Sequence, residues 1–125
     1  MDAAMQHYLD GMKLFGQGEY EQAIAKFDEA LVEKPDWADV LLSKATCLSN
    51  LGRHDEAIKL AERVTELEPD EPLGYTSLSM FHMRLEHIEE AEKVQAKARM
   101  VSWKKELKTN PDAPPPMDGP MNVVQ

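Results

Sequence analysis

A seven-residue pattern recurs along the chain at a constant interval. Residues 18–24, GEYEQAI, return as residues 52–58, GRHDEAI, and more faintly as residues 86–92, EHIEEAE. The alanine inside each segment, at positions 23, 57 and 91, fixes the period at 34 residues. A period of this size is typical of repeat architectures, in which similar units stack and share one continuous core. The sequence therefore predicts a stack of three units.

The apolar residues within each unit have the spacing of amphipathic helices. In the second unit Val40, Leu41, Ala45 and Leu48 recur at intervals of three or four residues, and strand-like alternation is absent. Prolines stand at positions 35, 69 and 72 and then five times from 111 to 120, so they avoid the helix interiors that they would break. The pattern predicts an all-α fold with two helices in each unit.

A 34-residue helix-turn-helix period resembles the tetratricopeptide repeat. The resemblance implies a right-handed α-solenoid of three units, residues 4–37, 38–71 and 72–108, within one repeat domain of residues 1–108. It also implies that the two helices of each unit cross at a small residue, which is Gly11, Ala45 or Ser79. The turn glycines are then residues 18 and 52, and the closing prolines are residues 35 and 69.

The third unit departs from this pattern at three positions. Glu86 replaces the turn glycine, His82 stands where leucine stands at 14 and 48, and Trp103 replaces the closing proline. Because no stop signal follows, we expect one long helix over residues 88–108, about 31 Å in length. Near its end Met100, Trp103 and Leu107 form an apolar stripe that lacks the polar capping helix usual in repeat proteins.

The proline-rich segment 109–125 is expected to be an irregular tail, extended or disordered. Its apolar residues Met121, Val123 and Val124 could cover the stripe of the last helix or enter the groove, within one molecule or between two copies. The alternative is a tail that touches nothing. The sequence leaves both open.

Charge and composition exclude several function classes. The chain carries 23 acidic and 14 basic residues, a formal charge of -9, which opposes binding to nucleic acid. The apolar residues are too interrupted for a membrane span. A single cysteine, Cys47, and a start without the basic and apolar runs of a secretory signal favour the cytoplasm.

We find no pattern of residues that predicts an enzyme, a cofactor site or a metal site. His7, His54, His82 and His87 include no pair three or four residues apart, the spacing that places two ligands on one helix face. Cys47 lies among apolar residues, where a packing role is expected. The sequence therefore predicts a noncatalytic protein that needs no cofactor or metal.

The family resemblance places a binding groove along the first helices of the three units. The function it implies is protein or peptide binding, as an adaptor, assembly factor or scaffold subunit that holds an apolar or amphipathic segment. The alternatives are a secretion-type chaperone and a structural subunit that forms homo-oligomers. The expected groove residues are Met5, Tyr8, Met12, Phe15, Leu42, Thr46, Leu73, Thr76, Met80 and Met83.

The best-known recognition mode of the family is a set of basic and amide side chains that holds the C-terminal carboxylate of cytosolic chaperones. The matching positions here are Tyr8, Met12, Ser43, Leu73 and Ser77, none of which is a cation. A buried carboxylate without a cationic partner is strongly destabilised. We therefore expect that the groove does not bind a chaperone C-terminal tail.

Basic residues concentrate in the last predicted helix. Residues 88–108 hold six basic and four acidic side chains, a net of +2 within a chain of -9. Cations near the end of a helix stabilise it by interacting with its dipole. The alternative that the sequence leaves open is an acidic docking partner.

Overall fold

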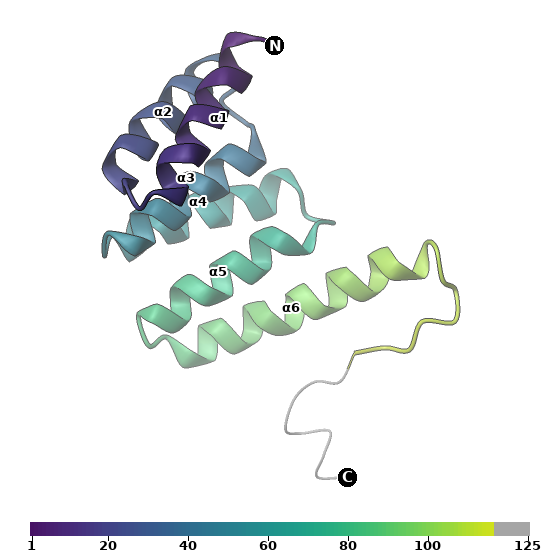
Figure 1. Cartoon of the computed structure of the whole chain (residues 1–125). Helices are drawn as coiled ribbons and strands as arrows, with labels where there is room; N and C mark the ends of the chain where they lie inside the picture. Colours follow the sequence, from purple (N-terminus) through teal and green to yellow (C-terminus); the bar gives the residue numbers. More distant parts are fainter. Residues whose placement is uncertain (117–125) are drawn as a thin grey trace.

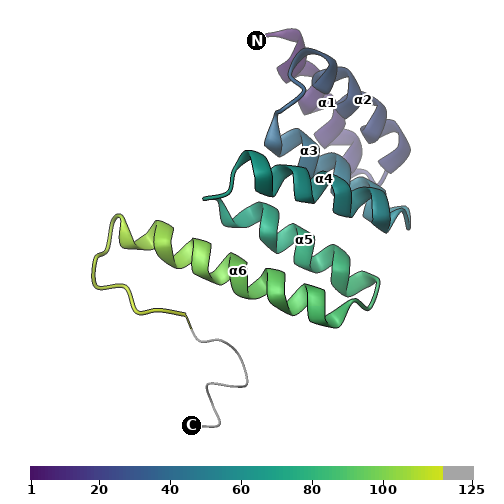
Figure 2. The same ribbon diagram turned by 180° about the vertical axis from the view of Figure 1, so that it is seen from behind.

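The structure, a computed structural model, describes residues 1–116, and this part of the chain folds into six helices arranged as three antiparallel pairs (Figures 1 and 2). Consecutive helices pack against each other, and α1 and α3, and α3 and α5, are also in contact. The result is the all-α solenoid expected from the repeat. The helices are α1 Ala3–Gly16, α2 Tyr20–Glu33, α3 Ala38–Asn50, α4 His54–Leu67, α5 Pro72–Arg84 and α6 Ile88–Leu107.

The turn inside each unit has the same backbone geometry three times. The turn residue is left-handed in every case, with φ of 78° at Gly18, 84° at Gly52 and 61° at Glu86. The residue after it donates its N–H to the carbonyl five positions earlier, at 2.9, 2.8 and 2.9 Å in the three units. Glycine adopts positive φ without strain, whereas other L-residues do so at a cost. The third unit therefore keeps the turn although it lacks the residue suited to it.

The helices of each pair cross at the small residue predicted from the repeat. A Cβ atom on Gly11 would lie 2.5 Å from Cε1 of Phe27, so the ring occupies the space that a side chain would need. Ala45 fills the same position in the second unit and is fully buried. In the third unit the Ser79 hydroxyl donates to the Ala91 carbonyl oxygen at 2.8 Å and contacts Gln95 Oε1 at 3.1 Å.

The core is built from the apolar stripes of all three units. The repeat alanines at positions 23, 57 and 91 are fully buried, as are the large side chains of Phe27 and Phe81. Cys47 packs in the cluster around Phe27. Burial raises the pKa of its thiol to about 11, which keeps the thiol protonated at neutral pH and unreactive.

The last helix is the longest of the six, with 20 residues. It ends at Leu107, one residue before the end expected from the sequence. Residues 109–116 then turn back along α6 (Figures 1 and 2). In this segment Ala113 is buried, and its carbonyl oxygen accepts a 3.0 Å hydrogen bond from Nε1 of Trp103. The tail residues expected to dock, Met121, Val123 and Val124, lie outside the described residues.

Candidate functional site

Two neighbouring hollows lie along the first helices of the three units. The first lies on α1, α3 and α5, and the second on α5 and α6. We call them the Tyr8 hollow and the Met80 hollow.

The Tyr8 hollow joins α1, α3 and α5 and has a volume of about 250 Å³. Its Tyr8 ring packs against Trp37, with ring centroids 5.1 Å apart, and against Phe27 at 6.2 Å. Leu73 and Met12 are exposed at its edge, with 58% and 37% of their surface open to solvent. The lining residues are Tyr8, Met12, Phe15, Asp39, Leu42, Ser43, Thr46, Leu73 and Ser77.

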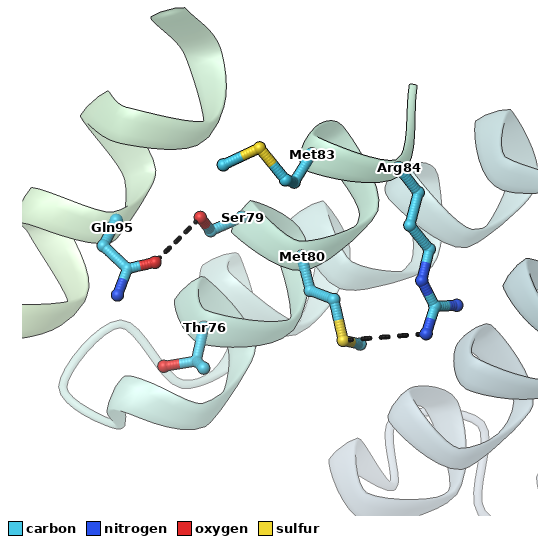
Figure 3. A pocket seen from close by; sticks show the side chains of 6 residues that line it. All are labelled: Thr76, Ser79, Met80, Met83, Arg84 and Gln95. Atoms are coloured by element: carbon cyan, nitrogen blue, oxygen red, sulfur yellow. Dashed lines mark hydrogen bonds between the residues drawn. The ribbon is translucent and has the colours of Figure 1, made fainter. Parts of the chain in front are cut away.

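The Met80 hollow lies on α5 and reaches α6 (Figure 3), with a volume of about 340 Å³. Met80 and Met83 lie over it with 39% and 49% of their surfaces exposed. Arg84 borders the hollow, but its guanidinium is held toward α3 by hydrogen bonds to Ser49 Oγ at 2.5 Å and Asn50 Oδ1 at 3.1 Å. The lining residues are Thr76, Ser79, Met80, Met83, Arg84 and Gln95.

Several hydroxyl groups in the hollows donate to the backbone of their own helices. Ser43 Oγ donates to the Asp39 carbonyl oxygen at 2.9 Å, and Thr46 Oγ1 to that of Leu42 at 3.0 Å. Thr76 Oγ1 donates to the Pro72 carbonyl oxygen at 3.1 Å. A hydroxyl has one proton to donate, so these three groups have none left for a ligand. The hollows therefore offer mainly methyl, thioether and aromatic surface.

The charge of the Tyr8 hollow is negative. Asp39 is the charged residue among those that line it. The nearby Lys44 is engaged elsewhere, because its Nζ lies 2.7 Å from Asp28 Oδ1 on α2. A ligand carboxylate in this hollow would thus meet another carboxylate and no cation, so the geometry disfavours an anionic ligand here.

The structure brings together nine of the ten groove residues that the sequence predicts, divided between the two hollows. Met5 is half-buried on α1 and lines neither of them. The groove prediction omitted the other six lining residues, which are Asp39, Ser43, Ser77, Ser79, Arg84 and Gln95. Asp39 could have been found by helical spacing, since it precedes Ser43 by one turn. Gln95 lies on α6, where its Oε1 is 3.1 Å from Ser79 Oγ at the helix crossing.

The histidines include one close pair that the sequence rule overlooked. Nδ1 of His82 and Nδ1 of His87 are 3.3 Å apart across the turn between α5 and α6. The rule tested spacings within one helix, whereas this pair joins α5 to the residue that directly precedes α6. Across residues 1–116 no group of three or more His, Cys, Asp or Glu side chains is arranged to hold a metal ion.

Comparison with protein families gives a match to a tetratricopeptide-repeat model over residues 14–81, just over half of the chain. Hsp70-Hsp90 organizing protein of Triticum aestivum is 30% identical over 115 residues, which are 92% of this chain and 18% of that protein. The chain therefore spans less than a fifth of this relative. None of the helices in the described part of the chain is long and apolar enough to cross a membrane.

Solved structures share the same helical arrangement. PcrH, in complex with the chaperone binding region of PopB, superposes with a TM-score of 0.76 at 21% identity, covering 81% of this chain and 82% of PcrH. The second repeat domain of Spaghetti (RPAP3), bound to the HSP90 peptide SRMEEVD, has a TM-score of 0.72 at 17% identity and covers 78% of this chain and 91% of that domain. At these identities the likeness shows the fold alone.

Proposed function

The chain belongs to the tetratricopeptide-repeat family of protein-interaction modules, and we propose that its two hollows form one groove that binds an apolar or amphipathic segment of another protein. The observation that carries the proposal is the lining of the hollows, where exposed methionines and leucine lie beside hydroxyls already bonded to their own helices. Thioether side chains adapt to irregular apolar partners and recur at such binding surfaces. The proposed activity is noncatalytic.

We propose that the groove differs in specificity from a site for chaperone C-terminal tails. The relative from Triticum aestivum is named for Hsp70 and Hsp90, and the Spaghetti domain holds an HSP90 peptide. In this chain the positions that would hold the peptide carboxylate are Tyr8, Met12, Ser43, Leu73 and Ser77, and Asp39 adds a negative charge beside them. These residues support binding of an apolar segment in place of a carboxylate.

The proposed role is that of an adaptor, assembly factor or scaffold. The proposed location is the cytoplasm, where the lone Cys47 needs no disulfide partner. The secretion-type chaperone is a specific form of the same proposal, and it gains support from PcrH, whose structure contains the chaperone binding region of PopB. The structural homo-oligomer would use the stripe Met100, Trp103 and Leu107 of α6. In the described chain the Trp103 N–H is occupied by Ala113, which favours a tail contact at that stripe over a contact between copies.

The groove is tested with a library of random 12-residue peptides selected on the immobilised protein. We expect apolar or amphipathic sequences to be enriched, and Tyr8→Ala together with Met80→Ala to weaken their binding by about 2 kcal/mol or more, with unchanged helicity. A matched control is Val32→Ala with Leu67→Ala, two exposed apolar residues on α2 and α4.

The same assay separates the groove from a carboxylate site. The peptide SRMEEVD with a free C-terminus should show no binding up to about 100 μM. The proposal fails if this peptide binds and its amidated form does not, or if the Val32 and Leu67 control loses as much binding as the groove variant.

A further inference from the structure

A third hollow lies away from the groove, where the α4–α5 loop faces the C-terminal half of α6 (Figure 1). It has a volume of about 280 Å³. Lys97, Val101 and Lys104 of α6 are four and three residues apart, and Lys108, the residue that follows the helix, is four residues further on, so these positions share one face; Lys105 of α6 lies beside them. We call it the lysine hollow, and it is lined by Pro69, Asp70, Lys97, Val101, Lys104, Lys105 and Lys108.

The charge of the lysine hollow is opposite to that of the molecule. Four lysines and one aspartate line it, which gives a net of +3 in a chain whose formal charge is -9. Lys105 is neutralised, since its Nζ lies 2.6 Å from Glu71 Oε2. Within residues 1–116 the ammonium groups of Lys97, Lys104 and Lys108 form no ion pair. Three cations thus surround a hollow whose wall includes the buried side chain of Val101.

Stabilisation of the helix end accounts for only some of these lysines. The favourable interaction of a cation with the helix dipole falls off within the last turn. Lys104 and Lys105 lie in the last turn of α6, and Lys108 directly follows it. Lys97 lies more than two turns before Leu107, so the dipole gives no reason for a cation at that position. Its place on the same face as Lys104 and Lys108 points to a common anionic ligand.

We propose that the lysine hollow is a second docking surface, which binds an acidic segment of a partner protein. A hollow of this size admits one or two carboxylate side chains. Lysine ammonium groups act as point charges and accept carboxylates without the fixed fork geometry of arginine. Nucleic acid and anionic membranes are extended polyanions and would also meet the acidic remainder of the chain within about one Debye length, roughly 8 Å at physiological salt. A short acidic peptide meets chiefly the lining of the hollow, where four lysines outnumber Asp70.

This surface is separate from the groove, so its test does not depend on the groove. The probe is a fluorescein-labelled hexaglutamate peptide, amidated at its C-terminus, with hexaglutamine as the neutral reference. Binding is followed by fluorescence anisotropy at about 50 and 200 mM salt, a range over which exposed charge interactions are progressively screened. Circular dichroism checks that each variant is folded.

Two variants with the same net charge decide the outcome. Lys97→Gln, Lys104→Gln and Lys108→Gln together should weaken hexaglutamate binding about tenfold at the lower salt concentration. The matched control carries Lys13→Gln, Lys59→Gln and Lys93→Gln, at three exposed lysines outside the hollow. It should change the affinity for hexaglutamate by less than about twofold. The groove variant Tyr8→Ala with Met80→Ala should bind the probe as the original chain does.

Three results would overturn the proposal. The first is no binding of hexaglutamate by the unsubstituted chain at 50 mM salt. The second is an equal loss in the two lysine variants, because this would show long-range attraction without a site. The third is tighter binding of single-stranded RNA or anionic lipid vesicles than of hexaglutamate through the same three lysines, which would assign the hollow to a different class of ligand.

Discussion

The third repeat unit has the same helix crossing and the same turn geometry as the first two units, but different residues form them. At the helix crossing, the first unit places Gly11 beneath an aromatic ring and the second uses a buried alanine, whereas the third uses a serine that donates to the Ala91 carbonyl oxygen. At the turn, two glycines correspond to Glu86, which keeps the left-handed φ. Backbone geometry is thus preserved along the stack, while the third unit has a polar residue at its crossing and a non-glycine residue with positive φ at its turn.

The largest expected effect in this comparison is at the first crossing. Gly11→Ala places a Cβ atom 2.5 Å from Cε1 of the fully buried Phe27, and the ring must move. Overpacking outweighs the gain in helix propensity, so we expect a loss of about 1–2 kcal/mol in the free energy of unfolding. Urea unfolding measures it. Gly16→Ala on the same helix is the control, because nothing lies within 4 Å of its Cβ position, and it should be neutral or stabilising. Equal effects of the two substitutions would contradict the crossing argument.

The tail contact is the second way to separate the third unit from the others. We expect deletion of residues 111–125 to lower the melting temperature by about 4 °C, since the Trp103 N–H loses its bond to the Ala113 carbonyl and the ring is exposed. In a Trp37→Phe background Trp103 is the sole tryptophan, so its emission should shift to the red on deletion.

The control for the tail is Trp103→Phe in the full chain, which removes the N–H donor and keeps an aromatic ring. It should lower the melting temperature by part of the amount that the deletion does, because it removes the same hydrogen bond. If melting temperature and Trp103 emission are unchanged by the deletion, the tail is a passive extension of the last helix.

The fold could be predicted well from the sequence, because the same pattern of residues occurs in each repeat unit and each occurrence supports the others. The 34-residue period, the small residues at the crossings and the absence of interior prolines were enough to predict three helix pairs, and this prediction is confirmed. The shortening of α6 by one residue lies within the usual uncertainty of helix ends. The tetratricopeptide resemblance was likewise confirmed by the family match over residues 14–81.

The details of the site were less accessible to prediction, because they depend on side-chain contacts that form only in the folded chain. The ion pair of Lys105 with Glu71 joins residues 34 apart, and the His82–His87 pair joins α5 to the residue that directly precedes α6. Neither appears in a pattern of spacing within one helix. The hydroxyl of Thr46 counts as polar in a sequence, yet in the fold it donates to its own helix. A residue-by-residue reading of the groove therefore overstates how many polar groups remain for a ligand.

The smallest effect is expected from substitutions of the turn residues in the second and third units. Glu86→Gly removes the cost of a side chain at φ of 61°, and we expect a gain of about 0.5–1 kcal/mol in the free energy of unfolding. Gly52→Ala should lose a similar amount, because φ there is 84°.

Sterics do not confound this comparison, since nothing lies within 4 Å of a Cβ atom built on Gly52, so the effect of Gly52→Ala reports backbone strain in the fold together with the reduced entropy of the unfolded chain. Both variants are measured by urea unfolding with a common m-value, which checks that the compactness of the unfolded state is unchanged. The carbonyl oxygens of Leu48 and His82 accept equivalent hydrogen bonds, so the two turns have the same backbone geometry. Placing glycine in one turn and removing it from the other should therefore change the free energy of unfolding in opposite directions. A loss of stability on Glu86→Gly would mean that the Glu86 side chain stabilises the third turn by an interaction that outweighs its backbone strain.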